Sequence, residues 1–213
     1  MKIARHSPPV WRLAAAALVA LGLSGCASRP TLYYTLAAPA GAPAAARAAN
    51  DAPLFIELAP IALPERLARP QLVVQQQGSA QSPQLQVLEQ HRWASSFENE
   101  LRDALASGIA AQLGAIDLTR SARQPGQPAW RIAVQLRQFE AVENTRVDAA
   151  FSWTVRRAGE DRSAACHWSA TEPVGTGIDA LAQGAQRLSA RAAEAIARHL
   201  AALQANPAAS CQS

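Results

Sequence analysis

The chain has 213 residues, of which 49% are hydrophobic and 17% charged, and its formal net charge is +4. Three of its cations, Lys2, Arg5 and Arg12, stand at the very N-terminus, so the remainder is close to neutral. A nearly neutral chain lacks the concentrated basic surface that nucleic-acid binding needs. We therefore expect no nucleic acid among its partners. The length of the chain favours a single domain.

The first 25 residues have the layout of a signal peptide. A basic start precedes an apolar stretch from Leu13 to Leu23, which is shorter than the roughly 20 residues of a membrane-spanning helix. Leu23-Ser24-Gly25-Cys26 then resembles the bacterial lipobox. That resemblance implies cleavage before Cys26 and acylation of its thiol and new amine. Residue 27 is Ala, not the Asp that resembles an inner-membrane retention signal, which implies the outer membrane of a Gram-negative cell. An ordinary cleaved signal with a chance cysteine is the alternative.

The mature chain divides into three predicted parts. Residues 26–53 form a lipidated N-terminal region, in which 32–36 resembles a short strand and 37–52 is a flexible or extended segment rich in Ala and Pro. A single domain is predicted over 54–205, followed by a tail at 206–213. Short apolar runs predict three strands early in this domain, at 54–58, 72–76 and 85–89, with a polar turn at 78–83.

Two long helices are predicted from apolar residues that recur every three or four positions. The first has its buried face at Phe97, Leu101, Leu105, Ile109 and Leu113. Ser95 and Glu98 match a capping box at its start, and Gly114 stands where a helix C-cap glycine belongs.

The second helix closes the domain. Its buried face is Leu181, Ala185, Leu188, Ala192, Ile196, Leu200 and Leu203. Asp179 is its predicted N-cap and Pro207 lies just beyond its end.

Between the helices, alternating apolar residues predict an antiparallel meander with one solvated face. Its strands run from Trp130 to Leu136, Val147 to Val155 and Cys166 to Ala170, after a short run at 116–118. Phe139 breaks the alternation, which indicates a bulge or a strand end. The predicted fold class is therefore α+β: a mostly antiparallel sheet with two long helices packed on one face.

The search for chemistry finds no nucleophile elbow, zinc-protease motif or phosphate-binding loop. The mature histidines, His91, His167 and His199, lack ligand spacing. Cys166 and His167 are neighbours on a strand and point to opposite faces, so they do not form a nucleophile pair. We therefore expect no enzyme, no cofactor and no metal.

Two features of the mature chain keep alternatives open. Cys166 and Cys211 are a disulfide candidate in an exported protein, and two free thiols are the alternative. Arg156, Arg157 and Arg162 cluster near a predicted turn. They are either a solvated hairpin tip or a contact for lipid phosphate or an acidic partner.

The mature chain is similar to the PqiC-type lipoproteins, the auxiliary lipoprotein component of MCE-type ABC lipid transporters. The residues that carry the resemblance are Tyr33-Tyr34-Thr35-Leu36, the stretch from Ile61 to Val73, Arg92-Trp93-Ala94, Phe139-Glu140 and Trp153. Among them, the family-motif or interaction candidates are Tyr34, Leu63, Pro64, Arg69, Pro70, Trp93, Phe139 and Trp153. All of these first suggest a scaffold role.

The resemblance implies a non-enzymatic accessory subunit at the outer membrane. Its implied partners are an MCE-domain periplasmic protein, an inner-membrane permease and ATPase, and the membrane itself through the lipid anchor. A homo-oligomer is a further candidate assembly. The alternatives are a periplasmic protein that binds a lipid or ligand itself, which would need a sizeable apolar pocket, and a general envelope-assembly lipoprotein.

Overall fold

The computed structural model describes residues 29–37, 52–76, 78, 84–121 and 127–211. The chain separates into one unit up to Thr31 and a second from Leu32 to Ser213, and the description below concerns the second. The predicted signal peptide 1–25, Cys26, residues 38–51 and residues 79–83 lie outside the described part. None of the described helices combines the length and apolar character that crossing a membrane requires.

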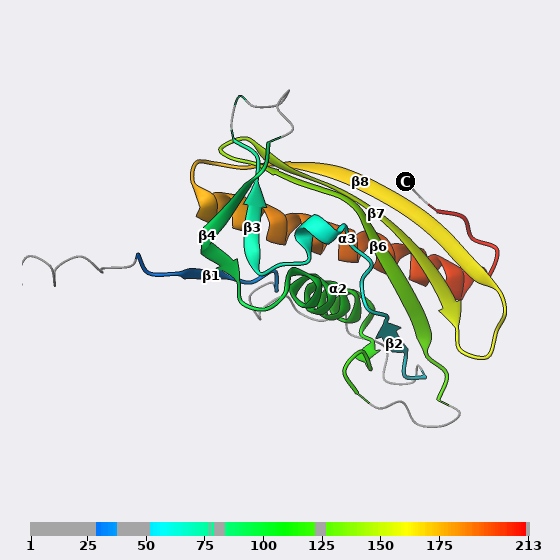
Figure 1. Cartoon of the computed structure of the whole chain (residues 1–213). Helices are drawn as coiled ribbons and strands as arrows, with labels where there is room; N and C mark the ends of the chain where they lie inside the picture. Colours follow the sequence, from blue (N-terminus) through cyan, green and yellow to red (C-terminus); the bar gives the residue numbers. More distant parts are fainter. Residues whose placement is uncertain (1–28, 38–51, 77, 79–83, 122–126, 212–213) are drawn as a thin grey trace, which may run out of the picture. The chain divides into compact units, whose positions relative to one another are not determined.

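The larger sheet of the described chain is mixed (Figure 1). Its order is β5 (Ile116–Asp117), β2 (Phe55–Leu58), β6 (Trp130–Val142), β7 (Arg146–Arg157) and β8 (Ser163–Pro173). Strands β6, β7 and β8 are antiparallel, whereas β2 runs parallel to both β5 and β6. The predicted meander is therefore confirmed, and short parallel strands extend it at one edge.

One face of β6 and β7 is apolar over most of its length, because alternate residues point the same way. The cross-strand pairs on this face include Ile132–Val155, Val134–Trp153 and Leu136–Phe151, and all six side chains are buried. The register shifts between Leu136 and Gln138. This bulge returns the following Phe139 to the buried face, so the predicted break in alternation is confirmed.

A smaller sheet lies beside the larger one. Its order is β1 (Leu32–Tyr34), β4 (Gln86–Trp93) and β3 (Gln71–Val74). β1 is parallel to β4, and β3 is antiparallel to it. Between β2 and β3 the chain passes along β6 and through the short 3-10 helix η1 (Glu65–Leu67). Backbone bonds of Gln75 to Ala141 and Glu143 join the end of β3 to the end of β6.

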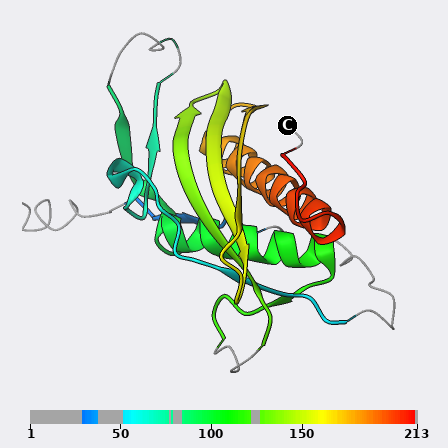
Figure 2. The same cartoon turned by 90° about the vertical axis from the view of Figure 1, so that its right-hand side faces the viewer.

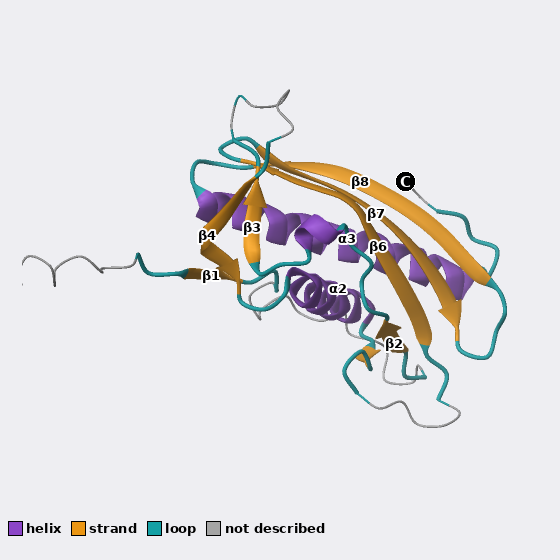
Figure 3. Cartoon of the chain, viewed as in Figure 1, coloured by secondary structure: helices purple, strands orange, loops and turns teal. Residues whose placement is uncertain are grey.

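The helices α2 (Phe97–Leu113) and α3 (Ile178–Ala205) lie on the same side of the long strands, which curve over them (Figures 2 and 3). They approach closely where Gly108 faces Ala193, since a Cβ atom on Gly108 would lie 2.8 Å from the Ala193 Cβ. The predicted fold class, α+β with two helices on one face of the sheet, is confirmed.

Both predicted N-caps are wrong. The cap of α2 is Ser96, whose hydroxyl accepts from the Asn99 amide, and the Ser95 hydroxyl instead donates to Glu100. The cap of α3 is Gly177. Asp179 lies in its first turn and accepts a hydrogen bond from Tyr34. Asp179 is therefore used in a tertiary contact and Ser95 in a local contact with the first turn of α2, whereas the predicted C-cap Gly114 is confirmed with φ 57°.

Candidate functional site

The aromatic residues singled out by sequence are part of the core. Trp93, Phe139 and Trp153 are 5%, 9% and 4% exposed. The Trp93 ring lies 5.4 Å from the Phe97 ring, which lies 5.0 Å from the Phe139 ring. This row joins β4, α2 and β6, so these side chains hold the two sheets and the first helix together and are not free to meet a partner.

The proline-containing stretch forms the loop around η1. The carbonyl of Pro64 accepts from the Leu67 amide at 2.9 Å, and the carbonyl of Pro70 accepts from the Trp93 amide at 2.7 Å. Proline supplies an acceptor without needing a donor of its own, which suits both positions. Leu63 packs against the core. From Pro64 to Pro70 the exposed side chains are Glu65, Arg66, Ala68, Arg69 and Pro70, so Arg69 and Pro70 are among those available for contact.

Tyr34 connects three elements through its hydroxyl. It donates to Asp179 Oδ1 of α3 at 2.7 Å and lies 2.8 Å from His91 Nδ1 of β4, which then acts as donor to the tyrosine oxygen. Burial, followed by the hydrogen bond to Asp179 and its negative charge, raises the pKa of Tyr34 to about 12. The hydroxyl therefore keeps its proton near neutral pH and fastens β1 to α3 instead of serving as a base.

Glu100 forms a second attachment for the N-terminal strand, one that sequence reasoning missed. Its carboxylate is 9% exposed and accepts from the Thr35 hydroxyl at 2.8 Å, the Leu36 amide at 3.0 Å and the Ser95 hydroxyl at 2.9 Å. A buried carboxylate requires such donors. The sequence feature that could have predicted its burial is its spacing, because Glu100 stands three residues after Phe97 and shares the buried face of the helix.

An open groove of about 420 Å³ lies between β1 and the start of α3. Its lining includes Leu32, Tyr33, Thr35, Asp179, Gln183 and Gln186. The Gln186 amide also donates to the Ala37 carbonyl. The groove thus combines two exposed apolar side chains with polar groups that already hold the strand in place.

The apolar interior next to this groove is filled. A cavity between the small sheet and the helices measures about 10 Å³ and is lined by residues such as Leu72, Trp93, Phe97 and Leu181. Such a space holds at most one water molecule, far less than a lipid acyl chain requires.

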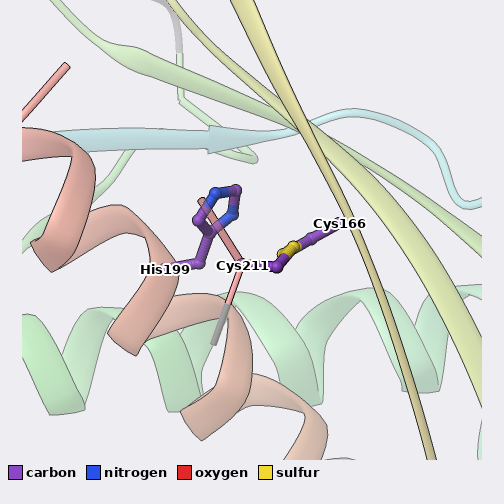
Figure 4. A group of neighbouring side chains, drawn as sticks. All are labelled: Cys166, His199 and Cys211. Carbon is purple, nitrogen blue, oxygen red and sulfur yellow. A yellow bond between two sulfur atoms is a disulfide. The ribbon is translucent and has the colours of Figure 1, made fainter. Parts of the chain in front are cut away.

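Cys166, Cys211 and His199 lie together, with sulfur and ring nitrogen atoms within 4.8 Å of one another (Figure 4). The two cysteines are joined as a disulfide, and their Cα atoms are 5.7 Å apart, a distance typical of such bonds. His199 Nδ1 accepts from the Trp153 indole at 3.0 Å, so Nε2 carries the ring proton. Nε2 has no partner in the described part of the chain.

This cluster does not suit a metal ion. A metal on Nε2 would move the proton to Nδ1, where it would face the indole N–H of Trp153, and a metal on Nδ1 would displace that hydrogen bond. The disulfide also occupies both sulfur atoms. Burial lowers the pKa of His199, which favours the same neutral ring.

The arginines near the β7–β8 turn are exposed. Arg157 lies 3.6 Å from Glu160, whereas Arg156 stands opposite Arg131 on β6. Like charges at opposite positions repel each other modestly. This geometry fits a solvated hairpin tip. Among the described residues, none of the other predicted site residues lies at this tip, so contact of these arginines with an anion stays a prediction.

Comparison with known proteins gives one family and several structures. The model of the ABC-type transport auxiliary lipoprotein component matches residues 34–197. The chain is similar to a crystal structure of an uncharacterised protein, with 18% identity, TM-score 0.60 and coverage of 81% of this chain and 99% of that one. Protein XCC0632 from Xanthomonas campestris matches with 15% identity, TM-score 0.59 and coverage of 84% and 99%. The search of curated proteins gives no match.

Proposed function

Since the chain belongs to the family of ABC-type transport auxiliary lipoprotein components, we propose that it is a non-enzymatic accessory subunit of an MCE-type ABC lipid transport system. In this proposal Cys26 carries the acyl chains, and the domain stands at the periplasmic face of the outer membrane. Several acyl chains on one residue anchor a protein firmly, whereas a single chain binds marginally. The family match over residues 34–197 is the observation that carries the proposal.

The packed interior supports an accessory role over that of a lipid carrier. Binding sites for molecules of lipid size are enclosed and occupy several hundred Å³. Among the described residues, the cavity inside the apolar core measures about 10 Å³, and the groove of about 420 Å³ beside β1 is open to solvent. A domain filled by its own side chains contributes to transport through its surface. Lipid would then pass through its partners, an MCE-domain protein with an inner-membrane permease and ATPase.

The exposed loop after η1 is the candidate contact for those partners. Arg69 and Pro70 are exposed, and their backbone is held in place, because the Arg69 amide donates to the Leu67 carbonyl and the Pro70 carbonyl accepts from the Trp93 amide of β4. A loop whose backbone is already held in place loses little backbone freedom on binding, which favours specific contact.

Genetic interaction tests the proposed function. Deletion of this protein, deletion of the transport permease and deletion of both should sensitise the cell envelope to detergent to the same degree. In the strain that lacks only this protein, the wild-type protein should restore detergent resistance, and the Cys26→Ser variant should not. A double deletion markedly more sensitive than either single deletion would show that the two proteins act separately, and the proposal would fail.

A further inference from the structure

Two consecutive apolar side chains on β1 are only partly covered by the rest of the domain. Leu32 is 46% and Tyr33 65% exposed, and the other large hydrophobic side chains with high exposure in the described chain, Leu85 and Ile116, are far from them in sequence. Neighbouring residues on a strand point to opposite faces, so these two side chains flank β1, the edge strand of the small sheet. Single exposed apolar residues are ordinary, whereas two that flank one sheet edge and line the same groove form a small apolar contact surface.

The covalent chain limits what this pair can meet. Leu32 follows Cys26 by six residues, and an extended chain spans about 3.5 Å per residue, so roughly 20 Å separate the two at most. If Cys26 is acylated, β1 stays within that reach of the bilayer. Tyrosine and leucine suit the boundary between headgroups and acyl chains, because each buries apolar surface while the tyrosine hydroxyl stays hydrated.

We propose that Leu32 and Tyr33 rest in the interface of the lipid bilayer and make β1 a second, non-covalent membrane contact of this protein. The inference rests on the acylation of Cys26 in the proposed function and adds the surface through which the domain sits on the membrane.

The attachment of β1 lets this contact orient the whole domain. Tyr34 binds His91 and Asp179, and the residues that follow it bind Glu100. β1 is therefore fixed to the small sheet and to both helices. Contact at Leu32 and Tyr33 would hold the domain in one orientation, which a lipid anchor alone does not fix.

The chemistry of the contact is apolar. Among the described residues that line the adjoining groove, Asp179 carries the charge, and its carboxylate already accepts a hydrogen bond from Tyr34. The contribution of Leu32 and Tyr33 should consequently change little with ionic strength, since salt screens charge interactions and leaves apolar burial intact.

Photo-crosslinking in living cells tests the inference. The full-length protein carries photoreactive p-benzoyl-phenylalanine in place of Tyr33 or, as a matched control, in place of Ile116, which is 49% exposed on β5. After illumination, adducts are separated and analysed for phospholipid. We expect lipid adducts to be several-fold more abundant at position 33 than at position 116. This ratio should be the same for cells suspended in buffer of low salt and of high salt.

Two results would overturn the inference: lipid adducts no more abundant at position 33 than at position 116, or adducts at position 33 that contain protein instead of lipid. Membrane fractionation of the same cells separates this failure from failure of the anchor, because a protein missing from the membrane fraction disproves acylation. Repeating the experiment in cells without the MCE-type transporter tests the membrane contact independently of the transport proposal, because lipid adducts at position 33 should persist there.

Discussion

At the scale of single residues, burial decides what each polar group can do. His199 is 5% exposed, and its Nδ1 is occupied by the Trp153 indole. A second proton on the ring would face that indole N–H, so the neutral form is favoured. Sequence named His199 as lacking ligand spacing, but it could not show the indole partner, which stands 46 residues away.

His199 makes stability depend on pH. Burial lowers its pKa below the ordinary value of 6.5 in the folded protein. Below about pH 6.5 the unfolded chain therefore binds more protons than the folded one, so the free energy of unfolding is lost as pH falls through 6.5 toward the folded pKa. We expect the urea midpoint to fall between about pH 7.5 and about pH 5.5.

The matched variants for this prediction are His199→Gln and His167→Gln. His199→Gln should flatten the fall in the urea midpoint, while His167→Gln, at an exposed position, should leave it unchanged. An equally steep fall in His199→Gln would assign the effect to other groups.

Thiol labelling before and after reduction tests the disulfide between Cys166 and Cys211. It closes a loop with a sequence separation of 45 and ties the C-terminal tail to β8. In the denatured exported protein, we expect neither of these thiols to react before reduction and both to react afterwards. The Cys166→Ala/Cys211→Ala variant should lose about 2–4 kcal/mol of unfolding free energy. Labelling of both residues without a reductant would establish two free thiols.

At the scale of elements, the periodic patterns predicted most helices and strands within a few residues. The first helix begins at Phe97 and ends at Leu113 as the apolar spacing indicated. Strand partners were less accessible, because the parallel pairings of β1 with β4 and of β2 with β6 join segments far apart in sequence. Local patterns report which face of an element is buried and not which neighbour covers it.

Close packing of α2 on α3 depends on the absence of a side chain at Gly108. Glycine to alanine inside a helix ordinarily adds up to about 1 kcal/mol of stability. Here the new Cβ would lie 2.8 Å from the Ala193 Cβ, so the helices must separate. We expect Gly108→Ala to lower the unfolding free energy by about 1–3 kcal/mol in urea titrations. Gln112→Ala, exposed on the same helix, is the control and should change it by less than about 0.5 kcal/mol.

Glu100 should control the attachment of β1. In Glu100→Gln the carboxylate loses its charge-assisted bonds to Thr35, Leu36 and Ser95, at a cost of about 1–3 kcal/mol. Amide hydrogen exchange should accelerate at Tyr34 and Leu36 more than in β6 or β7. Glu194→Gln, exposed on α3, serves as control. Unchanged protection at Leu36 would show that β1 is held by other contacts.

At the scale of the whole molecule, sequence identified the family and the fold class, and the family match and the architecture confirm both. It predicted the candidate site less well. Of the eight motif residues, Trp93, Phe139 and Trp153 are core, whereas the groove beside β1 depends on α3, which is more than 140 residues further along the chain. A site formed by such distant segments has no local sequence pattern.

The account as a whole depends on the partner. The most direct measurement is purification of the full-length, Cys26-anchored protein in mild detergent, with mass spectrometry of the proteins retained and the Cys26→Ser variant as control. We predict recovery of an MCE-domain protein together with its permease and ATPase. Recovery of outer-membrane assembly or cell-wall proteins, with no MCE component, would contradict the proposed function.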